Sequence, residues 1–203
     1  MPAHRTIAAS PDAAADSALS ERLARFRGKA EPLGVRVAHV AGGGEAASVV
    51  AALASEWGAT GAVATSQALA SLPGLFTALA GEGVGTEQAS SPEHCRDRAL
   101  GIGLGLLALA ETGSVLVAEE SLADRSVGML TAALVLLVPA GVLADGLEDA
   151  APALREIAGR GGGRFATLIT GPSRTADIER VLTVGVQGPG KVAVVFIDEA
   201  GGA

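Results

Sequence analysis

The feature that most constrains the fold is an alternation of short apolar runs with amphipathic segments. Apolar runs of strand length occur at Val35–Val40, Ala59–Thr65, Leu134–Val138, Phe165–Thr170 and Val192–Ile197. Apolar residues at helical spacing occur between them at Glu45–Trp57, Gln67–Leu79 (broken at Pro73) and Leu147–Ile157. Strands that alternate with helices usually form a parallel sheet that helices cover on both faces. The pattern therefore predicts an α/β fold with three layers, α/β/α, around a mainly parallel sheet.

The stretch from Leu168 to Ile197 predicts one wall of a ligand site. An apolar run ends at Gly171-Pro172, and a polar set that includes Ser173, Thr175 and Asp177 follows before the last apolar run. This order is typical of a strand–loop–helix–strand unit, and open α/β sheets bind ligands at the carboxyl ends of their strands. The alternative is that Ser173 or Thr175 only caps the helix, with Asp177 in its first turn.

A second candidate segment is Leu100–Ala118, where glycines and aliphatic residues lead into Glu111-Thr112-Gly113-Ser114. The segment predicts two antiparallel strands joined by a tight turn. Glu111 lies between apolar residues, so it is either a turn residue or a buried carboxylate with a perturbed pKa. Residues 119–125 are predicted to form a polar loop.

Arg125 is the only cation between Ala99 and Leu154. A lone arginine between apolar strands is most often a surface cation. In a cleft, its guanidinium would instead clamp a carboxylate or phosphate through two hydrogen bonds.

Length and composition limit the classes of protein to which the chain can belong. With 203 residues we expect a flexible N-terminal arm over residues 1–19 and one domain over 20–203, beginning with a short helix from Ser20. A net charge of −7, a pI near 5.0 and 2% aromatic residues argue against nucleic-acid binding. The N-terminus lacks the apolar core of a signal peptide, and the longest apolar stretch, Met129–Ala144, is interrupted and too short to span a membrane. We therefore expect a cytoplasmic protein.

Cysteine and histidine are too few to predict a cofactor or metal site. The single cysteine, Cys95, can form neither an internal disulfide nor a cluster that needs about four thiolates. His94 is adjacent to Cys95, and adjacent side chains point in different directions, so we expect a structural role for both. The three histidines show no metal-ligand spacing.

Two segments resemble the lactate-utilisation (LUD) family. AETGSVLV at 110–117, followed by Arg125, is similar to one family element, and TGPSRTADIE at 170–179 with GVQGP at 185–189 is similar to its closing signature. The resemblance covers residues from about Ser20 to Ile197. It implies a fold like that of ribose-phosphate isomerases and CoA transferases, and a role in oxidising L-lactate to pyruvate beside two iron–sulfur partner proteins. Family members commonly carry a histidine where this chain has Gln187, and a Pro and a His before the central strand, where it has Leu130 to Ala133.

Together these patterns predict one cleft for a small carboxylate or other anionic ligand. Glu111 or Asp177 would be the base, Arg125 the clamp, and hydroxyl groups and glycine backbone would complete the walls, from Thr112, Gly113, Ser114, Gly171, Ser173, Thr175, Gln187 and Gly188. Two other functions stay open. An independent enzyme of the CoA-transferase superfamily could use Glu111 as a nucleophile, and the missing histidines favour a non-catalytic assembly or regulatory subunit.

Overall fold

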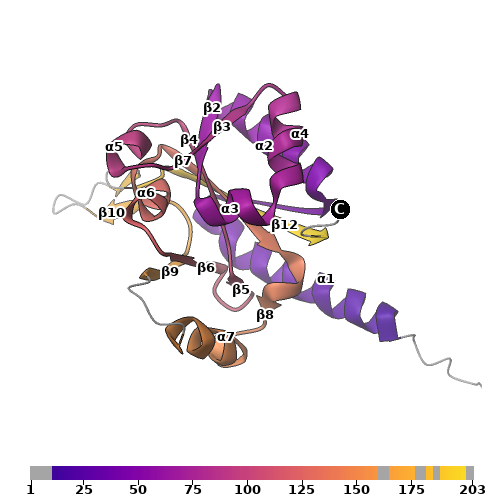
Figure 1. Ribbon diagram of the computed structural model, residues 1–203. Helices are drawn as coiled ribbons and strands as arrows, with labels where there is room; N and C mark the ends of the chain where they lie inside the picture. The colour runs from indigo at the N-terminus through magenta and orange to yellow at the C-terminus, as the bar shows by residue number, and fades with distance from the viewer. Residues whose placement is uncertain (1–10, 160–164, 177–181, 185–187, 200–203) are drawn as a thin grey trace, which may run out of the picture.

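A computed structural model describes residues 11–159, 165–176, 182–184 and 188–199, and its centre is a six-stranded sheet (Figure 1). The strand order is β1-β12-β7-β4-β2-β3, and every neighbouring pair is parallel. The strands are β1 (Val35–Gly42), β2 (Gly61–Ala64), β3 (Gly85–Gln88), β4 (Leu100–Leu104), β7 (Ala133–Pro139) and β12 (Lys191–Glu199). The predicted parallel sheet is confirmed, with four of the five apolar runs in it.

One face of this sheet is covered by three helices, α2 (Gly43–Trp57), α3 (Ser66–Ser71) and α4 (Pro73–Gly81). Their buried residues form one core cluster with alternate residues of the central strands, such as Val135, Leu137 and Val195. The predicted break at Pro73 separates α3 from α4, because proline has no N–H to continue a helix but is accepted in a first turn.

The opposite face is covered by helices α1 (Pro11–Ala30), α5 (Pro92–Cys95) and α6 (Leu122–Leu130), together with a second sheet. Phe26 of α1 is fully buried, and its ring meets that of Phe196 edge to face with the ring centroids 5.0 Å apart. A short 3-10 helix, η1 (Glu31–Leu33), connects α1 to β1. The α/β prediction with helices on both faces is thus confirmed, and a small sheet contributes to the third layer.

The second sheet has the order β8-β5-β6-β9 and lies below the main sheet in Figure 1. It consists of β5 (Leu107–Leu109), β6 (Ser114–Glu119), β8 (Leu143–Ala144), which follows the 3-10 helix η2 (Ala140–Val142), and β9 (Phe165–Ile169). Helix α7 (Leu147–Gly159) covers its outer side through a small apolar cluster. The segment Leu100–Ala118 was predicted as two strands but contains three: β4 belongs to the main parallel sheet, and only β5 and β6 form the predicted antiparallel pair, in a separate sheet.

The strand over Phe165–Thr170 is confirmed as β9, but its place was predicted wrongly. It pairs antiparallel with β6 rather than parallel within the main sheet. The helix predicted after Gly171-Pro172 is also wrong at its start, since Arg174–Ala176 is a strand, β10, that pairs antiparallel with β11 (Leu182–Val184). Because these residues are extended, the interpretation of Ser173 and Thr175 as helix caps is wrong as well.

Two further boundaries differ from the prediction. Helix α1 begins at Pro11 rather than Ser20, because the alanine-rich segment has high helix propensity and proline suits a first helical position. The division into an arm and one domain stays a prediction. The expected polar loop at 119–125 is instead the end of β6 and the start of α6, whose N-cap is Ser121. No helix in the described part of the chain is long and apolar enough to cross a membrane.

Candidate functional site

The tight turn between β5 and β6 carries the first predicted site segment. Gly113 donates its N–H to the Leu109 carbonyl at 2.9 Å and has a φ of +68°. A Cβ at Gly113 would lie 2.9 Å from the backbone nitrogen of Ala30 at the end of α1. The glycine is therefore required both by the left-handed backbone and by the close approach of α1.

A chain of hydroxyl groups connects this turn to the second predicted segment. Thr112 Oγ1 lies 2.8 Å from Ser114 Oγ, which lies 2.7 Å from Thr170 Oγ1. Ser114 is 4% exposed, whereas Thr112 and Thr170 are both exposed, so a buried hydroxyl connects two surface hydroxyls. The structure thus brings Thr112 and Ser114 beside the residue that precedes Gly171, although 56 positions separate Ser114 from Thr170.

Three other predicted residues meet in a cavity of about 180 Å³, which we call the glycine cleft. Its walls are Gly171, Ser173, Gly188, Pro189, Gly128, Met129, Leu134, Ile169 and Val192. The Ser173 N–H donates to the Pro189 carbonyl at 2.9 Å, which holds the two loops together. Gly171 (φ +85°) and Gly188 (φ +108°) both have left-handed backbone, a conformation that strongly favours glycine.

The glycine cleft lies at the amino ends of the parallel strands, whereas the prediction placed the site at their carboxyl ends. Leu134 and Val192 are the second residues of β7 and β12, so the cleft borders the amino ends of these strands. The prediction relied on β9 being a parallel member of the main sheet. Because β9 runs antiparallel in the second sheet, the loop after it lies at the amino ends of the main-sheet strands instead.

Arg125 lies on α6 and does not line the glycine cleft. Its guanidinium carbon is 4.1 Å from the centre of the Phe165 ring, a cation–π contact. In the β6–β9 register, Phe165 is opposite Glu119, whereas Ile169 is opposite Val115. Four residues of strand correspond to about 13 Å, so Arg125 is at the far end of this strand pair from Ser114 and Thr170.

Glu111 is an exposed turn residue, so the alternative of a buried carboxylate is wrong. Its side chain lines an open pocket of about 610 Å³ with Asp145, Glu148 and Asp149, and Arg25 pairs with Asp145 there. A Cβ on Gly146 would lie 2.6 Å from Glu111 Oε2. Glu111 therefore faces a different pocket from the glycine cleft.

The remaining predicted residues are only partly described. Thr175 belongs to β10 and is paired with Thr183. Asp177 and Gln187 lie outside the described residues. Their assignment as base and wall of the site stays a prediction.

Two buried carboxylates were missed by the sequence reasoning. Asp124 is 5% exposed and accepts hydrogen bonds from Ser66 N–H (2.7 Å), Ser66 Oγ (2.7 Å) and Ser121 Oγ (2.9 Å). Ser121 Oγ in turn accepts the Asp124 N–H at 3.0 Å, so Ser121-x-x-Asp124 is a helix-capping pair that the sequence could have revealed.

Glu119 is 9% exposed, and its Oε2 has no hydrogen-bond partner among the described residues. Burial raises the pKa of this carboxyl, while a backbone hydrogen bond and Arg125 lower it, and Asp124 adds a small raising effect. It lines a narrow cavity with Thr65 and Gln67. No local pattern signals this burial, since Glu119 belongs to the run Glu119-Glu120-Ser121 that is typical of a loop.

His94 and Cys95 do not form a pair. His94 lies between Ser90 Oγ (3.0 Å from Nδ1) and Glu87 Oε2 (2.8 Å from Nε2), whereas the fully buried Cys95 contacts the Ala123 carbonyl at 3.6 Å. Burial raises the pKa of the Cys95 thiol, which makes it less reactive. Over the described ranges, no three His, Cys, Asp or Glu side chains gather as a metal site.

Comparison with known proteins gives a family match and a fold match. A family model described as LUD domain matches residues 23–197. Lactate utilization protein C of Shouchella clausii is 34% identical over 103 residues, and that of Bacillus subtilis is 32% identical over 102. These alignments cover 49% of this chain and only 44% and 42% of the relatives. A crystal structure of a DUF162 family protein from Deinococcus radiodurans matches the fold with a TM-score of 0.57 at 20% identity, over 88% of this chain and 98% of that one.

Proposed function

Because the chain belongs to the LUD domain family, we propose that it acts in lactate utilisation and binds a small carboxylate in the glycine cleft. The relatives named lactate utilization protein C support a role in lactate utilisation. Each alignment spans less than half of the relative, so substrate and partners are part of the proposal.

The observation that carries the proposed site is the contact between the two family segments. Ser114 of the first segment lies 2.7 Å from Thr170 of the second, and the next residue, Gly171, lines the glycine cleft. Gly188, from the GVQGP segment, also lines this cleft. Residues from three separate parts of the chain are therefore held around one small cavity.

The size and lining of the glycine cleft suit a small acid. Its volume of about 180 Å³ is below the roughly 300–1,000 Å³ of clefts that hold drug-sized ligands. Leu134, Ile169 and Val192 offer an apolar wall for a methyl group. The guanidinium of the exposed Arg174 donates to the Leu33 carbonyl, and a Cβ on Gly171 would lie 3.3 Å from Leu33 Cβ, so one positive charge lies on the Gly171 side of the cleft. We assign the cleft a binding role and no acid–base step.

The proposal includes iron–sulfur partner proteins. Oxidation of lactate to pyruvate releases two electrons and two protons, which need an acceptor. This chain has one cysteine, and clusters normally need about four thiolates. The chain would hold the carboxylate while a partner carries the electrons. Co-purification of cysteine-rich proteins encoded beside its gene would test this part.

Filling the cavity provides the sharpest test of the site. A Cβ on Gly128 would lie 4.0 Å from Ile169 Cδ1 and from Leu134 Cδ2, so the longer side chain in Gly128→Leu should project between these two residues, which line the cleft. The control is Gly74→Leu on α4, where a Cβ has nothing within 4 Å. Thermal shifts with L-lactate, pyruvate and CoA would be measured on all three proteins.

L-lactate or pyruvate at a hundred times its Kd should stabilise the wild type and Gly74→Leu by about 2.7 kcal/mol. Gly128→Leu should show no such shift. Equal stabilisation of Gly128→Leu would place the ligand elsewhere. Stabilisation by CoA alone would favour a CoA-transferase-like enzyme, and no stabilisation by any of the three would favour a non-catalytic subunit.

A further inference from the structure

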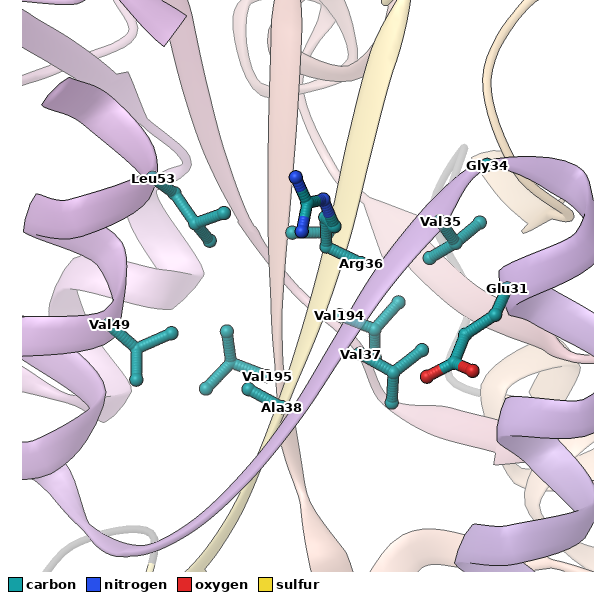
Figure 2. A pocket seen from close by; sticks show the side chains of 11 residues that line it. Glu31, Gly34, Val35, Arg36, Val37, Ala38, Val49, Leu53, Val194 and Val195 are labelled. Carbon is teal, nitrogen blue, oxygen red and sulfur yellow. The ribbon is translucent and has the colours of Figure 1, made fainter. Parts of the chain in front are cut away.

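One edge of the main sheet is formed by β1, which is hydrogen-bonded to β12 and to no other strand in the described part of the chain. A groove of about 470 Å³ runs along this strand. Figure 2 shows β1 crossing between α2 on one side and the end of α1 on the other, with Val49 and Leu53 facing it from α2. The groove belongs neither to the glycine cleft nor to the pocket of Glu111.

The sequence of β1, VRVAHVAG, lacks the usual protection of an edge strand. It contains no proline and no lysine, which natural edges use to prevent pairing with other chains. Its one arginine, Arg36, is turned toward α2, where it pairs with Glu56 at 2.7 Å. Val37, Ala38 and Val40 remain partly exposed.

The backbone at this edge is arranged to accept another strand. The Ala41 N–H donates to Glu45 Oε2 at 3.1 Å, so this N–H, near the carboxyl end of β1, is not free to pair with another strand. Backbone groups of alternate residues point to the same side of a strand. The N–H groups of Val37 and His39 therefore point outward like that of Ala41, and Val37 to Val40 are open to pairing.

The charge around the groove selects the occupant. Glu31 lines the groove, and Figure 2 shows its carboxylate pointing into it beside Val37. Glu45 lies at one end, Glu56 is paired with Arg36, and Asp198 Oδ1 lies 2.6 Å from His39 Nε2. Four carboxylates thus outnumber the three cationic or titratable basic groups at this edge. These are Arg36, His39 and Arg174, whose Nη2 would lie 3.9 Å from a Cβ on Gly34. A second copy of this chain, with its net charge of −7, would bring these carboxylates against each other.

We propose that β1 binds an extended segment of a partner protein that carries apolar residues on one face and lysine or arginine on the other. The segment adds to the sheet through backbone hydrogen bonds, a recognised mode of peptide binding. Its apolar side chains fill the groove toward Val49 and Leu53. Its basic side chains reach the Glu31 side, because side chains alternate between the two faces of a strand.

The probe is an octapeptide of alternating valine and lysine, capped at both ends and fluorescently labelled; its control alternates valine and glutamate. Anisotropy should show about tenfold tighter binding of the lysine peptide, weakening as salt screens the charges. Hydrogen exchange should show new protection of the Val37 and His39 amides. Glu31→Lys should weaken binding about fivefold, whereas Glu148→Lys on the distant α7 should leave it unchanged.

Val37→Pro tests the edge itself, since it removes an outward N–H and no bond to β12. It should abolish binding while the far-ultraviolet circular dichroism spectrum stays that of the wild type; Val37→Lys serves if this variant does not fold. Three results would overturn the proposal. They are equal affinity for the glutamate peptide, lysine-peptide binding that survives the Val37 variants, or a dimer of the chain alone that these variants disperse.

Discussion

Replacing Asp124 should test whether one buried carboxylate joins two helices from distant parts of the chain. Asp124 lies in the first turn of α6 and accepts the N–H and the hydroxyl of Ser66, 58 positions away at the start of α3. Hydrogen bonds to charged groups contribute about 1.5–3 kcal/mol each and do not add fully. Counting the Ser66 N–H and one hydroxyl, we expect Asp124→Ala to lower the free energy of unfolding by about 3–4 kcal/mol. In a chain of this size that corresponds to roughly 6–16 °C in Tm.

The assay is urea unfolding followed by circular dichroism, with three companion variants. Asp124→Asn keeps an oxygen for the Ser66 N–H and should lose about 1 kcal/mol. Asp149→Ala is the exposed control, a first-turn aspartate that accepts the Gly146 N–H at 3.2 Å, and should lose no more than about 1 kcal/mol. In a double-mutant cycle with Ser66→Ala, we expect a coupling energy of about 1–2 kcal/mol. An Asp124→Ala protein within about 0.5 kcal/mol of the wild type, or zero coupling, would refute the reasoning.

Three further changes probe other parts of the fold. Gly113→Ala should destabilise by at least about 2 kcal/mol in urea unfolding, because it adds left-handed strain to a Cβ 2.9 Å from the Ala30 nitrogen; an unchanged midpoint would contradict this. Phe26→Ala should cost about 3–5 kcal/mol, since the fully buried ring packs on Phe196, and a smaller loss would mean that α1 packs loosely. Burial raises the folded-state pKa of Glu119 above its ordinary 4.5, so its charged form destabilises the fold as pH rises through that range. Glu119→Gln should therefore gain stability relative to the wild type, on the order of 1 kcal/mol, at pH 8 but not at pH 4, and a gain independent of pH would exclude ionisation as the cause.

The sequence alone predicted four of the six strands of the main sheet, β1, β2, β7 and β12, and the helices on one of its faces, because their signals are local. It did not predict β3, or β4 as a member of this sheet. The run Val192–Ile197 is apolar at every position, as expected of a strand buried on both faces, and it became β12. Pro73 separates two helices because proline has no backbone N–H to continue the first one. The positions of Glu111–Ser114 and Gly171 in turns also followed from local chemistry. The family resemblance followed from two short sequence segments, and the family match confirmed it.

Pairing and burial were decided only by the tertiary structure. Periodicity shows that Phe165–Ile169 is a strand, but the strand against which it pairs depends on a segment about fifty positions away. Because of that pairing, the loop at Gly171 lies at the amino ends of the main-sheet strands. Arg125 contacts the Phe165 ring and not a ligand. Glu119 is buried for the same reason, because the second sheet and α6 close over it. Local sequence fixes backbone preference, whereas the surroundings of a side chain are fixed by residues that the chain brings near only when it folds.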